Sequence, residues 1–290
     1  MKSWGTASGR DDRLHGLLAI ARLTWTEARR TRIVLAAFVC AGLFLLVYGV
    51  AVFFLARTPG GAAPPALLRR TQLELLTLVG LYVANFLTLA FAVMVPVDSI
   101  SGEIDSGVMQ TLASKPITRA AIVIGKWLAF LALTAIYLLV VVAGVTLLVW
   151  LFSGFLQPHV AAALPLMFLG AAVLLSVSIA GGTRLKTVTN GIVVFAFYAI
   201  AFVGGWIEEF GFILGNTAAR YIGTAISLVS PVDALWRMAA HLMQPPLMQQ
   251  LRLSPFSSEA VPSPAMVVWA IGYVAATLLV ALRQFRMRPL

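Results

Sequence analysis

Charged residues are scarce in this sequence. Only 11% of its 290 residues are Asp, Glu, Lys or Arg, whereas 60% are hydrophobic. A soluble domain carries about 25% charged and about 45–50% apolar residues. The mean hydropathy of +0.94 deviates in the same direction. The sequence therefore predicts an all-α polytopic membrane protein rather than a soluble domain.

Cysteine is nearly absent as well. Cys40 is the only one and lies inside an apolar run, which excludes an internal disulfide and makes a poor metal site. No cleavable signal peptide is expected, since the first long apolar run begins near residue 33 and is long enough to stay in the membrane.

Motifs for chemistry are missing too. The phosphate-binding pattern GxxxxGK[ST] does not occur, because Gly125 and Lys126 are followed by Trp127. All three histidines lie outside the predicted spans, which argues against an intramembrane protease. We therefore expect no catalytic residue, no cofactor and no enzymatic activity in this chain.

A metal site is not expected either. Met238, His241 and Met243 lie close together in the sequence, and sulfur with imidazole suits copper. Their spacing puts Met243 on a different helical stripe from the other two, so packing explains them better. Whether Met238 and His241 have any metal role stays open.

Six long apolar runs predict six transmembrane helices within one domain, 1–290. Each is long enough to cross a hydrocarbon core of ~30 Å at ~1.5 Å per residue. The predicted spans are 33–55, 75–97, 127–151, 161–181, 188–206 and 264–282.

The basic residues set the expected orientation. The formal net charge is +10, and the bases flank apolar runs instead of forming a soluble basic face, so nucleic acid is not an expected partner. With the N-terminus inside, 15 of the 21 Lys and Arg residues fall on the cytoplasmic side. The positive-inside rule then places both termini in the cytoplasm. Arg57, Arg69 and Arg70 run against this bias.

Two regions outside the spans read as helical. Residues 13–32 form a basic amphipathic segment, which predicts an interfacial helix, the alternative being a plain extension of the first span. The outer region 207–263 predicts a helix within 212–229 and another after Ser230 and Pro231, with the serine as its cap. Both helices are expected at the outer surface or dipping partly into the membrane.

The spans hold only mild polar groups. No acid or base stands in the middle of any predicted span, which argues against a proton-driven carrier. Their hydroxyl and amide groups are expected to bond to neighbouring helices. These groups are Asn85, Thr88, Thr134, Tyr137, Thr146, Ser176 and Ser178.

The segment 98–119 is a long polar interruption between two spans. Apolar residues recur there every four positions from Ile100 to Leu112, which predicts one stripe on a short helix. Gly102 and Gly107 weaken that helix by roughly 1 kcal/mol each relative to alanine, so a supporting surface is implied. The helix must end before Pro116, and Thr118 is expected to cap the next one. A solvated loop helix without function is the alternative.

This segment resembles that of the ABC-2 type transporter permeases. The matching residues are Ile100, Glu103, Gly107, Leu112, 114–119 and Gly125–Lys126. Together with the stretch 227–236, the chain looks most similar to the permeases linked to maturation of multicopper enzymes, including nitrous oxide reductase. Val108 departs from the threonine found in many relatives.

The resemblance implies a function. Such permeases have six spans, an N-terminal interfacial helix and outer helices before the last span, and work as dimers with two separate ATPase subunits. It implies an inner-membrane permease, a homodimer, with a possible outer accessory protein. Residues 98–115 would be a coupling helix seated in the ATPase. The residues expected in ATPase docking are Ile100, Glu103, Ile104, Asp105, Gly107, Val108, Leu112, Lys115 and Arg119. A membrane-anchored assembly factor and a gradient-driven carrier are the alternative functions.

Overall fold

The computed structural model describes residues 8–28, 31–57, 66–97, 99, 102, 118–244 and 262–287. Helices dominate these residues, and none of them forms a strand. The helices are α1 (Ser8–Ala28), α2 (Arg32–Arg57), α3 (Ala66–Met94), α6 (Arg119–Ser153), α7 (Val160–Gly182), α8 (Thr187–Ile213), α9 (Thr217–Val229), α10 (Val232–Met243) and α12 (Ala265–Met287).

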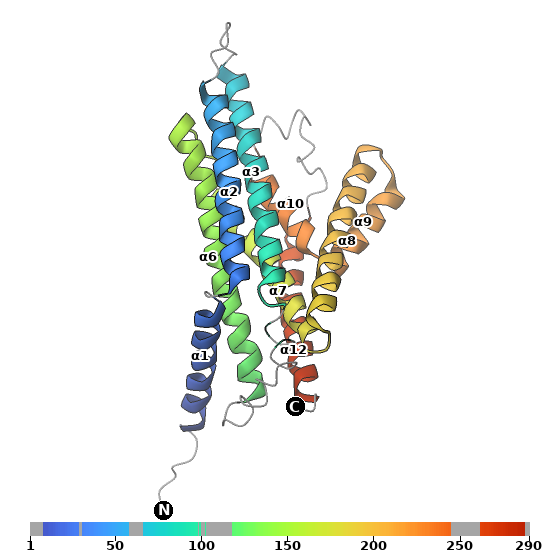
Figure 1. The fold of residues 1–290 in the computed structure, drawn as a ribbon. Coiled ribbons are helices and arrows are strands. Elements are labelled where there is room, and N and C mark those ends of the chain that lie inside the picture. The colour runs from blue at the N-terminus through green and yellow to red at the C-terminus, as the bar shows by residue number, and fades with distance from the viewer. Residues whose placement is uncertain are drawn as a thin grey trace, which may run out of the picture.

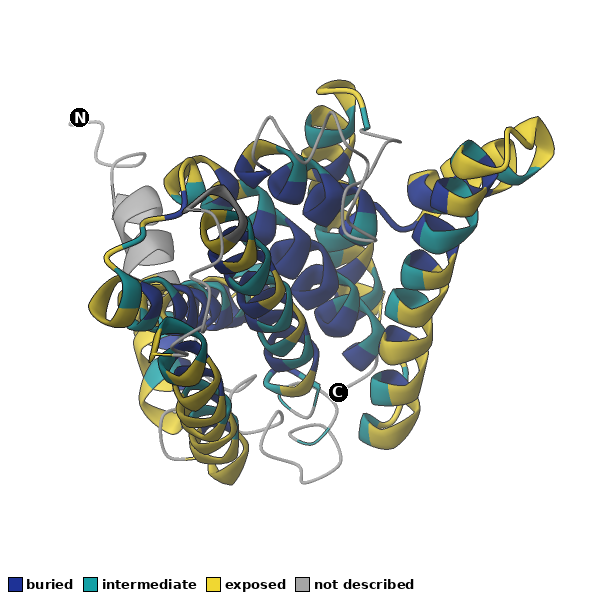
Figure 2. Ribbon diagram, turned by 90° about the horizontal axis from the view of Figure 1, so that it is seen from above, coloured by how far each residue is buried: buried dark blue, intermediate teal, exposed yellow. Residues whose placement is uncertain are grey.

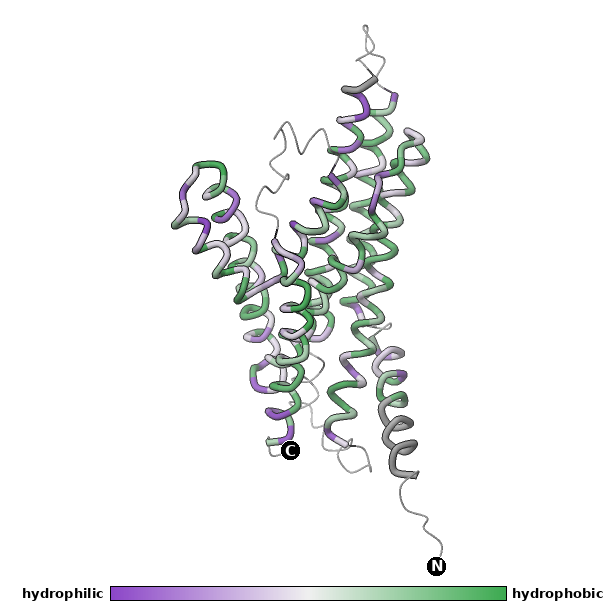
Figure 3. The backbone as a smooth tube through the Cα atoms, turned by 180° about the vertical axis from the view of Figure 1, so that it is seen from behind, coloured by the Kyte–Doolittle hydropathy of each residue, from purple (hydrophilic) through white to green (hydrophobic). Residues whose placement is uncertain are grey.

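Six of these helices are long and apolar enough to cross a membrane: α2, α3, α6, α7, α8 and α12. They stand side by side as one bundle, and the start of α1 and the end of α12 lie at the same end (Figure 1). Figure 3 shows that their residues are mainly hydrophobic. The prediction of an all-α protein with six spans is confirmed.

The core of the bundle lies around α7. This helix packs against α3, α6, α8, α10 and α12. Its residues from Gly170 to Ser176 are all buried. By contrast, only 22% of the span window in α2 and 11% of that in α12 are buried. Seen from above, buried residues gather in the middle and exposed ones outside (Figure 2). Because the exposed side chains are apolar, they suit contact with lipid chains.

Polar groups inside the bundle partly follow the expected pattern. The Tyr137 hydroxyl on α6 donates to the carbonyl of Ala37 on α2 at 3.2 Å, and the Ser178 hydroxyl on α7 donates to Val93 on α3 at 3.2 Å. These bonds join neighbouring helices, as predicted. Thr88 and Thr146 instead donate to carbonyls of their own helices. These two hydroxyl groups are hydrogen-bonded within their own helices, so these bonds do not join neighbouring helices.

α1 runs along the lower part of α6. The two helices pack against each other, and Figure 1 shows α1 nearly in line with the bundle, just before α2. α6 has 35 residues, which is ~52 Å of helix and well beyond the ~30 Å hydrocarbon core. α6 is therefore long enough to extend beyond the hydrocarbon layer and pack against α1 there. The interfacial placement of α1 stays a prediction.

The outer region differs from its sequence-based prediction. α8 continues to Ile213, whereas the predicted span ended at residue 206. Glu208 and Glu209, which were expected in the region after the span, therefore belong to the same helix. The Asn216 side chain accepts from the Ala219 amide and caps α9 at Thr217. α8 and α9 form a helical hairpin whose tip projects from the bundle (Figures 1 and 2). α9 thus runs back along α8 instead of lying flat at the end of the bundle.

The start of α10 also differs from the prediction. The helix begins at Val232, Pro231 occupies the cap position, and no side chain caps it. The hydroxyl of Ser230 has no hydrogen-bond partner among the described residues. The predicted serine cap is therefore wrong. α10 is instead held by packing against α7 and α8, with Leu235 and Ala239 fully buried.

Candidate functional site

Most of the predicted docking segment lies outside the described residues. This holds for Ile100, Glu103, Ile104, Asp105, Gly107, Val108, Leu112 and Lys115. The structure does describe Ser99 and Gly102 near its start and Thr118 and Arg119 at its end. These flanking residues show how the segment is attached to the bundle.

The end of the segment is attached to α6 and α12. The Thr118 side chain accepts from the Ala121 amide at 3.2 Å and caps α6, as the sequence predicts. Arg119 donates to the carbonyls of Phe285, at 3.3 Å, and Arg286, at 3.1 Å, in the last turn of α12. Cations suit the carbonyl end of a helix. Arg119 therefore joins the start of α6 to the end of α12, and its role in docking stays a prediction.

The start of the segment is attached to α6 through a buried lysine. Lys126 is only 3% exposed, and its ammonium donates to the Ser99 carbonyl at 2.6 Å. The next residue, Trp127, donates through its indole nitrogen to the Ser176 hydroxyl on α7 at 2.9 Å. Both ends of segment 98–119 are thus bonded to helices of the bundle.

A second polar site lies where α8, α9 and α10 meet. The Arg237 guanidinium donates to Glu208 at 2.7 Å and to the Ser227 hydroxyl at 3.1 Å. Its Nε lies 3.1 Å from Asp233 on the same helix. The three charged side chains are 8–14% exposed. This cluster connects all three helices through one cation.

Burial shapes the charge of this cluster. It raises the pKa of the Asp233 carboxyl to about 6, against the opposing effect of Arg237, and Glu208 adds to the rise. Gly205 on α8 leaves the space that the carboxylate occupies, because a Cβ there would meet the carboxyl group. A larger residue at position 205 would therefore force the Asp233 carboxyl group to shift.

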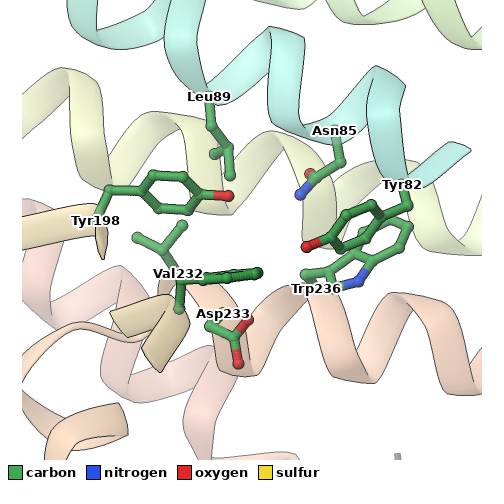
Figure 4. Close-up of a pocket in the computed structure, with 8 residues that line it drawn as sticks. Tyr82, Asn85, Leu89, Tyr198, Val232, Asp233 and Trp236 are labelled. Atoms are coloured by element: carbon green, nitrogen blue, oxygen red, sulfur yellow. The ribbon is translucent and has the colours of Figure 1, made fainter. Parts of the chain in front are cut away.

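A narrow cleft adjoins the cluster. Tyr82 and Asn85 of α3 and Tyr198 of α8 point their polar ends into it, with Asp233 and Trp236 of α10 below (Figure 4). The Tyr82 and Trp236 rings meet edge to face, with centroids 5.3 Å apart. The lining side chains leave no volume for a ligand. In this state the cleft is a packed polar junction between three helices.

Sequence reasoning missed the cluster for a clear reason. Asp233 and Arg237 are four residues apart on one helix, a spacing that signals an ion pair. Glu208, however, is 29 residues from Arg237 and comes from another helix. No local sequence pattern predicts an ion pair between residues this far apart in the chain.

The residues considered as copper ligands, Met238, His241 and Met243, all lie on α10. Met243 is fully buried in the core, while His241 is only partly buried. Among the residues that the structure describes, no group of three or more His, Cys, Asp or Glu side chains could hold a metal ion.

The described residues define a class: a polytopic membrane protein with six candidate spans. The family comparison is specific. Residues 18–290 match the model of the ABC-2 family transporter proteins. The chain belongs to this family, whose members are membrane subunits that work with an ABC ATPase. A search of curated proteins finds no significant match.

Proposed function

We propose that this chain is the membrane permease of an ATP-binding cassette transporter in the inner membrane, driven by a separate ATPase that docks on residues 98–115. The attachment of this segment is the observation that carries the proposal. Lys126 bonds one flank to α6, and Arg119 bonds the other to α12. A force applied at these two flanks would therefore reach both helices.

The contacts of α6 would pass this force on to the other helices. α6 is in contact with α1, α2, α3, α7 and α12. A tilt of α6 therefore changes its packing against most of the bundle. Closure of an ATPase pair at this end would move the spans of two permease copies, which is why we propose a homodimer.

Charge variants in the segment test the docking. Glu103→Arg and Leu112→Asp should each lower co-purification of the ATPase at least about tenfold. The first reverses a charge in the proposed contact, and the second places a charge at an apolar position of it. Arg220→Glu is the matched control, since Arg220 is exposed on α9, in the hairpin that projects away from the end with the termini (Figure 1). Complex formation by both variants at the wild-type level would refute docking on this segment.

The resemblance of residues 100–126 and 227–236 to permeases of copper-enzyme maturation suggests the process that the transporter serves. We propose that the transporter serves the maturation of a multicopper enzyme, with an outer accessory protein as a partner. A strain lacking the permease should then make that enzyme with less bound copper, measured on the purified enzyme. Normal copper content in that strain would refute this part alone.

A membrane-anchored assembly factor is the competing function. It would bind the same partners without moving a substrate. ATP turnover in proteoliposomes separates the two: a permease should raise the hydrolysis rate of its ATPase, and an inactive ATPase variant should abolish the effect. An unchanged rate would favour the assembly factor.

A further inference from the structure

A cavity of about 420 Å³ lies where the end of α1 meets the start of α2. Its walls come from the end of α1, the start of α2, the residues after α3 and the first part of α6. Its volume falls within the ~300–1,000 Å³ of small-ligand sites. It is separate from the Arg237 cluster, which lies on α8, α9 and α10.

Three spans end at the level of this cavity. Thr31 stands just before α2, and Ser99 follows soon after α3 ends at Met94. Lys126 directly precedes Trp127, the first residue of the span that the sequence predicts within α6. Because spans end where hydrocarbon gives way to headgroups, the cavity lies at headgroup depth in a bilayer.

The walls carry opposite charges on different helices. Lys126, on α6, supplies an ammonium group, and Glu27, on α1, supplies an exposed carboxylate. The Ser99 hydroxyl is buried and has no hydrogen-bond partner among the described residues. Ile33 and Phe130 add apolar surface. The cavity therefore suits a molecule with a phosphate, an ammonium group and an apolar part.

We propose that the cavity binds the headgroup of a phosphatidylethanolamine-type lipid. The phosphate would lie by Lys126 and the Ser99 hydroxyl, and the ammonium group by Glu27, in charge-assisted hydrogen bonds. Ile33 and Phe130 would contact the glycerol and the first acyl carbons. The carboxylate of Glu27 disfavours lipids whose headgroup carries only negative charge.

Lipid titration followed by native mass spectrometry tests this on the full chain in detergent. The probes are phosphatidylethanolamine, phosphatidylglycerol and soluble glycerophosphoethanolamine. The wild type should bind the first about three- to fivefold more tightly than the second, the range that one exposed ion pair supplies. Glu27→Gln should abolish this preference, and Lys126→Gln should weaken both lipids. Arg22→Gln, a charge removed from an exposed site on the same helix, should leave the preference unchanged.

Equal binding of both lipids to the wild type would overturn the inference, as would a Glu27→Gln variant that keeps the preference. If glycerophosphoethanolamine displaces the lipid at equal concentration, a soluble ester and not a lipid is the ligand, and the assignment is wrong. Should Lys126→Gln fail to fold, Glu27→Gln decides alone, because its side chain is exposed. The inference rests on the six spans and not on the proposed transport.

Discussion

Arg237 contacts side chains of three helices in the outer half of the molecule. Its guanidinium offers several donors in a fixed plane, so it reaches Glu208, Ser227 and Asp233 at once. A buried ion pair contributes little net stability compared with apolar packing, but removing one partner leaves the other charge unpaired. The cluster therefore fixes the position of α8 and α9 relative to α10.

Arg237→Met should destabilise the protein strongly. The change leaves two poorly solvated carboxylates without their cation, which costs about 3–5 kcal/mol. The free energy of unfolding in detergent, followed by a denaturant titration, measures this. The control is Arg220→Met on the exposed face of α9, where only the contact with the Phe212 ring is lost, at about 1 kcal/mol or less. Equal losses in both variants would show that the cluster adds nothing beyond a surface contact.

The pH dependence of stability should reveal Asp233. Its folded-state pKa is about 6, above the ordinary value of 3.8, mainly because of burial. A raised carboxyl pKa favours the folded state fully below about pH 3.8, and this contribution is lost as the pH rises through about 6.

Asp233→Asn removes that titration while keeping the shape of the side chain. The unfolding free energy of the wild type minus that of the variant should therefore fall between about pH 4 and about pH 6, and level off above. A difference that stays constant across this range would contradict the raised pKa.

At the scale of elements, the α8–α9 hairpin depends on small residues. A Cβ at Gly223 of α9 would lie 2.7 Å from both the Cα and the backbone nitrogen of Glu208 on α8. Small residues let helices approach this closely in membranes. The hairpin packs so tightly that its two backbones nearly touch.

Gly223→Ala should therefore force the hairpin apart. The clash involves backbone and not a flexible side chain, so we expect a loss of about 1–3 kcal/mol in unfolding free energy. Gly272→Ala on α12 is the matched control, because nothing lies within 4 Å of the added methyl group. It should be neutral or slightly stabilising through helix propensity. A loss in the control as large as that in Gly223→Ala would refute the close packing.

The spans were predictable because hydropathy and length report directly on membrane crossing. The Thr118 cap was also predictable, since capping depends on residues three positions apart. The end of α8 was not: Glu208 and Glu209 look like loop residues, yet packing against α9 and α10 extends the helix past them. Tertiary contacts decide such boundaries, and no local pattern carries them.

The attachment of segment 98–119 was predictable only in part. The sequence showed a polar break with a helical stripe, but neither the Lys126–Ser99 bond nor the Arg119 contacts with α12. The second of these joins residues 166 or more positions apart in the chain. Such pairings follow from the path of the whole bundle.

At the scale of the whole molecule, the two ends of the bundle differ, so its orientation in the membrane can be tested by chemical labelling. The first residues of α1 and the last of α12 share one end, and the tip of the α8–α9 hairpin points to the other (Figure 1). The distribution of basic residues predicts that both termini lie in the cytoplasm.

Single-cysteine labelling in intact cells tests this orientation. In a Cys40→Ser background, a cysteine at Thr217 near the hairpin tip should react with a membrane-impermeant maleimide. A cysteine at Lys186, exposed in the turn before α8, should react only after the cells are permeabilised. The opposite pattern would invert the topology and remove the docking segment from the cytoplasm.

Coupling to an ATPase is the central claim, since the family works with such a partner and both flanks of segment 98–119 are bonded to spans. Purifying the tagged chain from its native membranes in mild detergent, with quantification of what accompanies it, tests the claim most directly. We predict an ABC ATPase in a ratio of about one per permease chain, lost in the Glu103→Arg variant. A purified chain that carries no ABC ATPase, although it is folded and inserted, would contradict the claim.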